Sequence, residues 1–329
     1  MPQPFTRTAP QPGLIRSCSI WRALEELGDF PTLLILEAIW LGDNRFEAIC
    51  TRTSLTRPLI SGRLKSLEAK GYIRRSIYCE RPVRHEFLLE QKGIELFPVT
   101  MMLLFWERKW SSRRNALTIG ITHSACGHET TPVPRCRNCG GTVRAEDIDW
   151  QEGPGLGWIV PHHTRRRQQR DRTVIAESAM LFVEAAEILG DRWSGLALRS
   201  VFTGLHRFDE IQADSAMASN ILADRLGWLV ERGMLKARRY QTRPDRYGYY
   251  PTTKALDYLP ILLMLQLWGD RHFGSADGPP VLLKHRPCGG ALELVAGCGA
   301  CEGELTVGTV QLVPGRVPVD AVPADTRPG

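Results

Sequence analysis

The sequence predicts a mainly α-helical protein with small β-hairpins, built from two tandem copies of one domain, each followed by a small cysteine-containing β module. Its 329 residues match the length of two ordinary domains. One spaced set of residues, His123, Cys126, Cys136 and Cys139, recurs as His285, Cys288, Cys298 and Cys301, each 162 residues later (285 − 123). The same offset aligns Leu-Gly-Asp at 27–29 with Leu-Gly-Asp at 189–191, without a gap. A register kept over roughly a hundred residues indicates duplication.

Local patterns predict four helices at the start of the first copy, at residues 21–27, 33–40, 46–51 and from 56 to the residue before Gly71. Gly28 ends the first of them. Thr56 is suited to the N-cap of the fourth and Pro58 to its first turn. The apolar stripe of this helix consists of Leu59, Ile60, Leu64 and Leu67.

A hairpin and a closing helix complete the copy. Residues 72–78 and 85–89 are predicted strands joined by an Arg-Pro turn, and residues 93–110 a helix rich in large apolar side chains. The second copy repeats this, with a helix at 219–232, whose stripe is Ile221, Leu222, Leu226 and Leu229, and a hairpin at 235–250. A short helix, a turn, a longer helix and a hairpin are the plan of a winged helix-turn-helix domain.

The expected domain organisation has six segments: a winged helix-turn-helix domain at 14–112, a zinc-ribbon-like module at 113–146, a linker at 147–172, a second winged helix-turn-helix domain at 173–274, a second module at 275–312 and a disordered tail at 313–329. The linker contains Gly-Pro-Gly at 153–155 and three arginines at 165–167. The tail is rich in proline.

Composition excludes several classes of protein. No apolar run reaches the roughly 20 residues that span a bilayer, and the N-terminus lacks the order of a secretory signal, so we expect a cytoplasmic protein without membrane contact. Neither a phosphate-binding glycine loop nor a nucleophile elbow occurs, which argues against an enzyme. The net charge of +6 is compatible with a polyanionic partner.

Basic side chains gather on the predicted longer helices and hairpins, which indicates double-stranded DNA as the partner. The candidate DNA-binding residues are Thr56, Arg57, Ser61, Arg63, Lys65, Arg74, Arg75, Arg81 and Arg84 in the first copy, and Ser219, Asn220, Arg225, Lys236, Arg238, Arg239, Arg243 and Arg246 in the second. The alternative is a solvated hairpin edge protected by its charges. Arg63 and Arg225, in mid-helix, are either base readers or structural arginines.

The exposed N-terminal positions of the two longer helices differ in chemistry. The first copy has Thr56, Arg57, Ser61 and Lys65 there, and the second has Ser219, Asn220, Ala223 and Asp224. Because base contacts usually come from this half of a recognition helix, we expect the copies to prefer different half-sites.

Both cysteine–histidine groups have the spacing H-x2-C-x9-C-x2-C. Zinc prefers four such ligands in a tetrahedron, and two short knuckles supply them, so we expect one structural zinc site in each copy. Gly127 and Gly289 follow the first knuckle and ease its turn. Four ligands leave no open position for catalysis. The alternative is a ribbon that has lost its metal.

Several further motifs are similar to the HxlR-type family of winged-helix regulators. In the second copy they are Gly-Asp-Arg-Trp at 190–193, the segment 204–211, the segment 222–226, Gly-Met-Leu at 233–235, Arg243-Pro244 and Trp268. The first copy matches at 42–49, 60–67, 71–73, Arg81-Pro82 and Trp106, but has Phe30-Pro31 where the family has an arginine-tryptophan pair. The second copy has Ala255 where the family has a glycine, as Gly93 in the first.

This resemblance implies a bacterial-type transcription regulator whose dimer contacts come from its terminal helices. Two copies in one chain would then form an intrachain pseudo-dimer, or the chain a homodimer. Members often carry a cysteine near Cys18, and some such regulators sense oxidants, so Cys18 is either a redox sensor or a small buried residue, the ordinary role of Cys50 and Cys79. The closing helices around Trp106 and Trp268 line a small-molecule effector pocket or form core and dimer interface.

The leading hypothesis is therefore a sequence-specific DNA-binding transcription regulator. Repression is favoured over activation, because a repressor needs only to occupy a promoter. The alternative is a protein-interaction adaptor of the transcription machinery, in which the winged helices and ribbons serve as docking modules. Binding by such an adaptor would depend little on salt and would not need the wing arginines.

Overall fold

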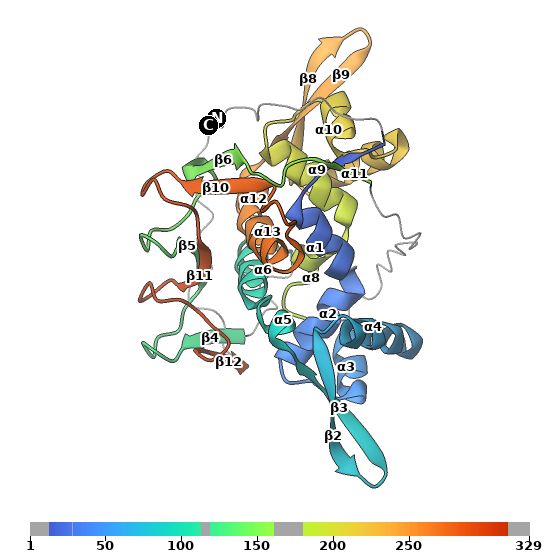
Figure 1. The fold of residues 1–329 in the computed structure, drawn as a ribbon, viewed down its shortest axis with the longest axis vertical. Helices are drawn as coiled ribbons and strands as arrows, with labels where there is room; N and C mark the ends of the chain where they lie inside the picture. Colours follow the sequence, from blue (N-terminus) through green and yellow to red (C-terminus); the bar gives the residue numbers. More distant parts are fainter. Residues whose placement is uncertain (1–12, 28, 113–118, 161–179, 315–329) are drawn as a thin grey trace. The chain divides into compact units, whose positions relative to one another are not determined.

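The computed structural model describes residues 13–27, 29–112, 119–160 and 180–314 (Figure 1). The chain divides into two compact units. Unit 1 contains Met1–Asp29, Arg135–Gln168 and Ile188–Leu294, and unit 2 contains Phe30–Pro134, Gln169–Glu187 and Val295–Gly329. We call the first and second copies of the duplicated sequence repeat 1 and repeat 2. Each unit therefore contains segments of both repeats.

Unit 2 holds the winged helix-turn-helix core of repeat 1. Its elements are α2 (Phe30–Trp40), α3 (Phe46–Thr53), α4 (Arg57–Ala69), β2 (Ile73–Glu80), β3 (Val83–Leu89), α5 (Gln91–Ile94) and α6 (Phe97–Trp110). The predicted closing helix is thus two helices, and Pro98 lies in the first turn of the second. The strands β2 and β3 pair antiparallel from Ile73↔Leu89 onward and project as a wing (Figure 1).

Unit 1 holds the equivalent core of repeat 2. Its elements are α9 (Arg192–Phe202), α10 (Phe208–Ser215), α11 (Ser219–Glu231), β8 (Leu235–Thr242), β9 (Asp245–Pro251), α12 (Thr253–Leu256) and α13 (Leu259–Phe273). The β8–β9 wing has its bulge between Arg239 and Gln241, and the β2–β3 wing has one between Ile77 and Cys79. Because the bulges lie at equivalent positions, the duplication extends to details of the backbone.

The N-terminal segment of each repeat lies in the unit that holds the other repeat's core. In unit 1, β1 (Ile15–Arg16) and α1 (Ser19–Leu27) of repeat 1 accompany the core of repeat 2, and α1 packs against α13 and α9. The indole rings of Trp21 and Trp193 lie 5.3 Å apart in this packing. In unit 2, residues 180–187, which include the start of α8 (Val183–Gly190), accompany the core of repeat 1.

Short two-stranded sheets surround the cysteines. In unit 2, β4 (Ile119–His123) pairs with β12 (Val310–Pro314), and in unit 1, β10 (Val281–His285) pairs with β6 (Ile148–Glu152). A third sheet consists of β5 (Pro132–Cys136) and β11 (Leu294–Cys298). Each of the first two sheets joins a strand of one repeat to a strand of the other.

Part of the predicted linker is regular structure. A 3₁₀ turn at Ala145–Asp147 leads into β6, and β7 (Trp158–Ile159) pairs with β1. The predicted disordered tail, 313–329, begins too early, because Val313 and Pro314 belong to β12 and pair with β4. The remaining linker residues 161–172, the predicted end of the first helix at Gly28 and the tail residues 315–329 lie outside the described residues. Among the described helices, none combines the length and apolar character that crossing a bilayer would need.

Candidate DNA-binding surface and metal centres

The recognition helix of unit 2 is α4. It begins after Thr56, the N-cap residue, and buries Ile60, Leu64 and Leu67, while Leu59 is half-buried. Ser54 adopts a left-handed conformation (φ 55°) in the turn from α3. The buried stripe leaves Thr56, Arg57 and Lys65 exposed and Ser61 half-buried, so the N-terminal half of α4 presents polar and basic groups to solvent.

The recognition helix of unit 1 is α11, which has the same frame. Its turn contains Ala216 at φ 50°, the equivalent of Ser54. The helix buries Leu222, Leu226 and Leu229, while Ile221 is half-buried. Ser219 and Asn220 are exposed at its N-terminus, so this helix offers hydrogen-bonding groups where α4 offers an arginine.

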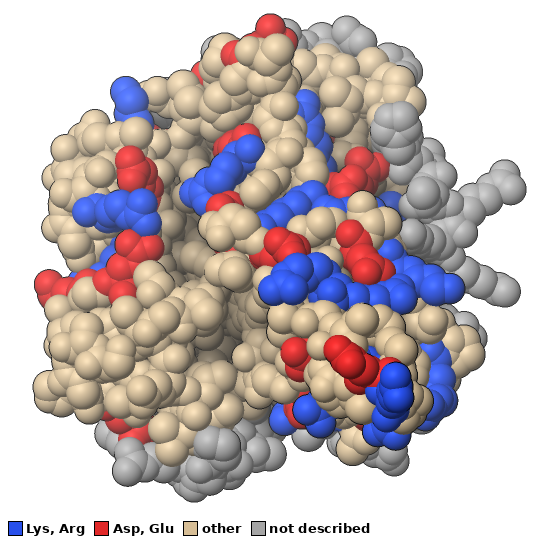
Figure 2. Space-filling view, turned by 60° about the horizontal axis from the view of Figure 1, so that its bottom comes forward, with Lys and Arg blue, Asp and Glu red and all other residues tan. Residues whose placement is uncertain are grey.

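Four arginines of the β2–β3 wing, Arg74, Arg75, Arg81 and Arg84, are all exposed. Arg74 forms a 3.0 Å ion pair with Glu90, and Arg75 a 2.8 Å ion pair with Glu68. Such exposed pairs contribute little to stability and leave the cations available to a polyanion. Figure 2 brings this end of the molecule forward and shows basic side chains gathered with acidic ones among them.

The β8–β9 wing is also basic. Lys236, Arg238, Arg239, Arg243 and Arg246 are exposed, and Arg239 is 3.4 Å from Asp245. The guanidinium of Arg238 lies 5.2 Å from the ring of Tyr250. Both wings therefore carry the candidate phosphate contacts that the sequence predicted, on solvent-facing strands and turns.

A cation–π pair between the first strand of each wing and the start of a helix was missed at the sequence level. Arg45, just before α3, lies over the ring of Tyr78 at 4.2 Å, and Arg207, just before α10, lies over Tyr240 at 5.0 Å. The pairs occupy equivalent positions and connect each wing to its helix-turn-helix. The signal was present, because Arg-Phe at 45–46 recurs at 207–208.

The two mid-helix arginines are half-buried. Arg225 forms a 2.6 Å ion pair with Asp191, and its side chain is only 16% exposed. Asp191 is also the N-cap of α9 and accepts a hydrogen bond from the Ser194 N–H at 3.0 Å. This geometry favours the structural alternative for Arg225, in which it braces α11 against the start of α9.

The eight predicted metal ligands form two groups, but the predicted pairing within each repeat is wrong. In unit 2, His123 and Cys126 of repeat 1 meet Cys298 and Cys301 of repeat 2. In unit 1, the group is Cys136, Cys139, His285 and Cys288. Each group thus combines the His-Cys knuckle of one repeat with the Cys-Cys knuckle of the other.

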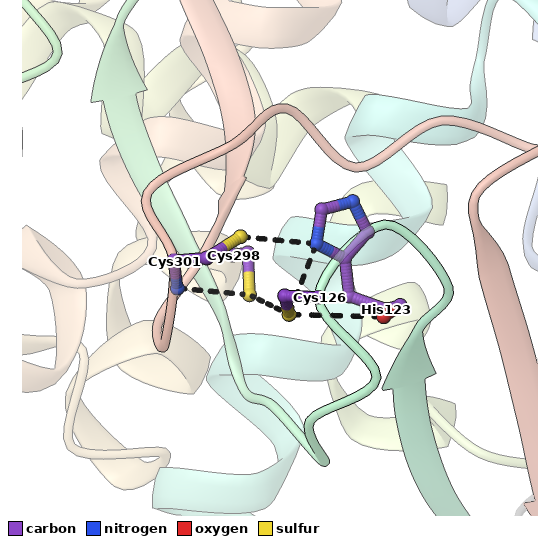
Figure 3. A group of neighbouring side chains, drawn as sticks. All are labelled: His123, Cys126, Cys298 and Cys301. Carbon is purple, nitrogen blue, oxygen red and sulfur yellow. Dashed lines mark hydrogen bonds between the residues drawn. The ribbon is translucent and has the colours of Figure 1, made fainter.

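The donor atoms of each group lie within 4.8 Å of one another. Figure 3 shows the imidazole and the three sulfurs of the unit 2 group turned toward a common centre. His123 Nδ1 is 3.2 Å from Cys301 Sγ and 3.5 Å from Cys126 Sγ. In unit 1, His285 Nδ1 is 3.4 Å from both Cys139 Sγ and Cys288 Sγ. A zinc tetrahedron with Zn–S bonds of about 2.3 Å has edges of about 3.4–3.8 Å, so both groups fit a metal ion.

Each knuckle closes in the same way. The residue after its second ligand is left-handed, with φ of 71°, 72° and 70° at Gly127, Gly140 and Gly289. Its N–H donates to the carbonyl of the first ligand, at 2.8 Å in all three. The predicted easing of the turn by Gly127 and Gly289 is confirmed. The fourth knuckle has Glu302 at φ 66° instead of a glycine.

The surroundings of Cys298 favour its thiolate. Burial opposes ionisation, but the Thr130 hydroxyl at 3.1 Å and the N–H groups of Cys301 and Ala300 near its sulfur outweigh it and hold the pKa of the thiol at about 6. A thiolate is the form that binds metal. Cys298 thus offers a thiolate to the unit 2 group.

Other candidate residues lie in the core. Cys18 is 2% exposed and lies beside the Arg199 guanidinium, so it lacks the solvent access that a redox sensor needs. Trp106 and Trp268 are also buried, at 0% and 2% exposure, which favours core over a pocket lining. Cys50 and Cys79 are half-buried.

The two units thus have the architecture of winged helix-turn-helix proteins. The family described as HxlR-like helix-turn-helix matches residues 27–115 and 188–277, which together make up more than half of the chain. The chain belongs to this family, and it contains the family's domain twice.

Its relatives are mostly shorter. An uncharacterized HTH-type transcriptional regulator of Mycobacterium tuberculosis is 34% identical over 138 residues, which cover 42% of this chain and 87% of the relative. One from Methanothermobacter thermautotrophicus is 32% identical over 30% of this chain and 75% of its own length. The solved structure of a candidate transcription factor from Pseudomonas aeruginosa is 35% identical, covers 40% of this chain and 84% of its own, and has a TM-score of 0.29.

Proposed function

We propose that the protein is a sequence-specific DNA-binding transcription regulator that acts as a repressor. The observation that carries the proposal is the recurrence, in both units, of a recognition helix beside an exposed basic wing. The relatives from Mycobacterium tuberculosis and Methanothermobacter thermautotrophicus, described as HTH-type transcriptional regulators, support it.

In this proposal the N-terminal halves of α4 and α11 read bases in the major groove, and the wings contact the phosphate backbone. The wing arginines supply affinity without sequence information, whereas the helix side chains supply specificity. Because α11 has Ser219 and Gly227 at the positions equivalent to Arg57 and Lys65 of α4, the two units recognise different half-sites. Occupancy of an operator that overlaps a promoter is sufficient for repression.

The test is selection of genomic DNA fragments by the purified full chain and by a variant with Arg74, Arg75, Arg238 and Arg239 changed to alanine. We expect the wild type to enrich a few promoter fragments and the variant to lose them. The matched control removes four exposed basic residues outside the wings, Arg137, Arg144, Lys284 and Arg286, and should retain the selection.

Salt dependence separates DNA binding from the docking alternative. Loss of phosphate contacts lowers the slope of log K against log salt by about one per contact, so the wing variant should show a slope smaller by up to about four. Uniform recovery of all fragments, or equal behaviour of the wing variant and its control, would contradict the proposal and favour an interaction adaptor.

Each exchanged Cys/His group, we further propose, holds a structural zinc ion. Three thiolates and one imidazole are the ligand set that zinc prefers, and four ligands leave no position open for a substrate. When bound, the ion would hold two knuckles that belong to different repeats. The residues of this chain supply the left-handed turns that close the knuckles, and the N–H groups of Ala300 and Cys301 donate to Cys298 Sγ.

Metal content tests both the binding and the exchange. The wild type should contain two zinc ions per chain by elemental analysis. His123→Ala with Cys301→Ser removes two ligands of one group and should leave one ion, whereas His123→Ala with Cys136→Ser damages both groups and should leave none. If the ligands paired within each repeat, the two results would be reversed.

A further inference from the structure

In unit 1, the N-terminal segment of repeat 1 docks through a buried charge network. Arg16 Nε is 2.8 Å from Asp214 Oδ1, and Arg16 Nη2 donates to Thr203 at 3.0 Å. Arg199 also pairs with Asp214 and donates to the Arg16 carbonyl at 3.2 Å. Arg199 and Asp214 are 3% and 5% exposed. The two arginines outweigh the effect of burial and lower the pKa of Asp214, so its carboxylate stays charged against Arg16.

In unit 2, the equivalent positions carry the opposite charges. Glu37 stands where unit 1 has Arg199, and Arg52 stands where it has Asp214 (199 − 37 and 214 − 52 are both 162). The segment that docks here, from repeat 2, contacts this glutamate through its backbone: the Leu181 N–H donates to the Glu37 carboxylate. Arg52 is engaged with Asp43. We call the surface on each core that binds the exchanged segment its seat: it includes Arg199 and Asp214 in unit 1, and Glu37 and Arg52 in unit 2. The two seats therefore differ in the charges that they offer to the segment.

The contact between the exchanged segment and the last helix of the core, α13 in unit 1 and α6 in unit 2, also differs between the units. In unit 1, a Cβ at Gly269 would clash with the Ser19 carbonyl oxygen, so α1 approaches α13 more closely than a side chain at this position permits. The equivalent residue in unit 2 is Glu107, whose carboxylate accepts the Glu184 N–H at 3.2 Å and the Ala185 N–H at 2.8 Å at the start of α8. The core of repeat 1 therefore has no room for α1 at this position.

A third pair of positions adds to the mismatch. A Cβ at Gly195 in α9 would meet Leu24 Cδ1 of α1 at 2.8 Å, and repeat 1 has Leu33 at the equivalent position. If the N-terminal segment of repeat 1 docked on the core of its own repeat, it would therefore meet Leu33, Glu107 and the reversed charge pair of Glu37 and Arg52. Specificity in proteins often rests on such clashes and misplaced charges against the wrong partner.

We propose that the two N-terminal segments and their two seats form a heterotypic lock, in which each segment fits only the core of the other repeat. The mismatches oppose pairing of like repeats from two copies of the chain, and in this structure each segment docks on the other repeat of the same chain, so we expect the chain to pair its own two repeats. The metal groups alone do not impose this, because either pairing offers one His-Cys and one Cys-Cys knuckle. The lock does not depend on DNA binding.

The mass of the intact, metal-loaded chain in solution is the first test. Light scattering during size-exclusion chromatography should give the single-chain mass of 37.0 kDa over about a hundredfold range of concentration. A mass of twice this value, at any concentration in the range, would overturn the proposal.

The second test places a repeat 1 residue in the seat of unit 1. Gly269→Glu should release α1, and limited trypsin digestion followed by mass spectrometry should show cleavage at Arg22 at least about tenfold faster. The control is Gly227→Glu on α11. Gly227 is helical like Gly269, but it is exposed, and an added Cβ there meets nothing within 4 Å.

Gly269→Ala keeps the test usable if the glutamate variant does not fold, because it adds only the Cβ that would meet the Ser19 carbonyl. It should speed cleavage at Arg22 by a smaller factor. If Gly269→Ala and Gly227→Glu are cleaved at the wild-type rate, the close approach of α1 does not select its partner and the proposal fails.

Discussion

Unit 1 and unit 2 share one order of elements but differ in chemistry at three equivalent places: the recognition helix, the seat of the exchanged segment and the last turn of a metal knuckle. The frame is retained down to the left-handed turns at Ser54 and Ala216. The groups that meet a ligand or the exchanged segment have diverged. Duplication thus supplied two copies of a scaffold, and the differences lie where a partner is recognised.

The largest effect is expected at Arg225, in the recognition helix of unit 1. Arg225→Ala should lower the free energy of unfolding by about 3 kcal/mol, because Asp191, 8% exposed in its side chain, loses the partner of a largely buried ion pair. Denaturant unfolding followed by circular dichroism measures this.

Arg57 on α4 is the control for this comparison. Its side chain is 64% exposed in its pair with Glu47, so Arg57→Ala should change stability by less than about 0.5 kcal/mol while it weakens DNA binding. Equal destabilisation by the two substitutions would contradict the structural role of Arg225.

The seats should respond differently to pH. Burial raises the pKa of Glu37 to about 8 and that of Glu107 to about 7, although backbone N–H groups oppose the shift. A carboxyl whose pKa is raised by folding binds more protons in the folded state, so unit 2 should lose stability as pH rises from about 4.5 to 8. Asp214 in unit 1 has a lowered pKa and should lose its contribution only on acidification below its ordinary range.

Glu37→Gln isolates this effect, since its amide oxygen can still accept the Leu181 N–H. The variant should flatten the decline in stability between pH 5 and 8 by roughly 2 kcal/mol, measured as unfolding midpoints in denaturant at several pH values. The exposed Glu146→Gln is the control. An unchanged pH profile in Glu37→Gln would mean that Glu37 is ionised throughout.

The smallest effect is expected at the knuckles. Gly140 and Glu302 are equivalent residues, and both are left-handed, at φ 72° and 66°. A side chain in this conformation costs about 1 kcal/mol, so Glu302→Gly should stabilise the unit 2 group and Gly140→Glu should destabilise the unit 1 group by similar amounts. Competition with a zinc-sensitive dye would detect the change, and shifts of the same sign would contradict this account.

The sequence predicted both helix-turn-helix motifs because their signals are local. The stripe of Ile60, Leu64 and Leu67 and the glycine at 71 define α4 within a single segment, and the offset of 162 transfers the prediction to α11. The same holds for the turns after Cys126 and Cys288. All of these depend on residues fewer than about 15 positions apart.

The pairing of the metal ligands could not be predicted in the same way. The spacing of nine residues between Cys126 and Cys136 suggested a short turn, but Pro132–Cys136 is a strand, and extended chain advances about 3.3 Å per residue. The second knuckle is carried away from the first. Since both repeats present the same two half-sites, the pattern is compatible with either pairing.

The buried charges were missed for a related reason. Glu37 and Arg199 lie in helices whose neighbours looked like ordinary core, and the exchanged segments that they contact lie more than a hundred residues away along the chain. A sequence shows that equivalent positions carry opposite charges, but only the fold shows which segment lies against them.

The exchanged segments also bear on how the protein is synthesised. Ser19, at the start of α1, hydrogen-bonds Asp270 of α13, which leaves the ribosome 251 residues later. The helix α1 therefore waits for nearly the whole of repeat 2, and the core of repeat 1 waits for residues 180–187. Contacts of such long range make folding slow, so we expect the nascent chain to depend on chaperones until both halves have been translated.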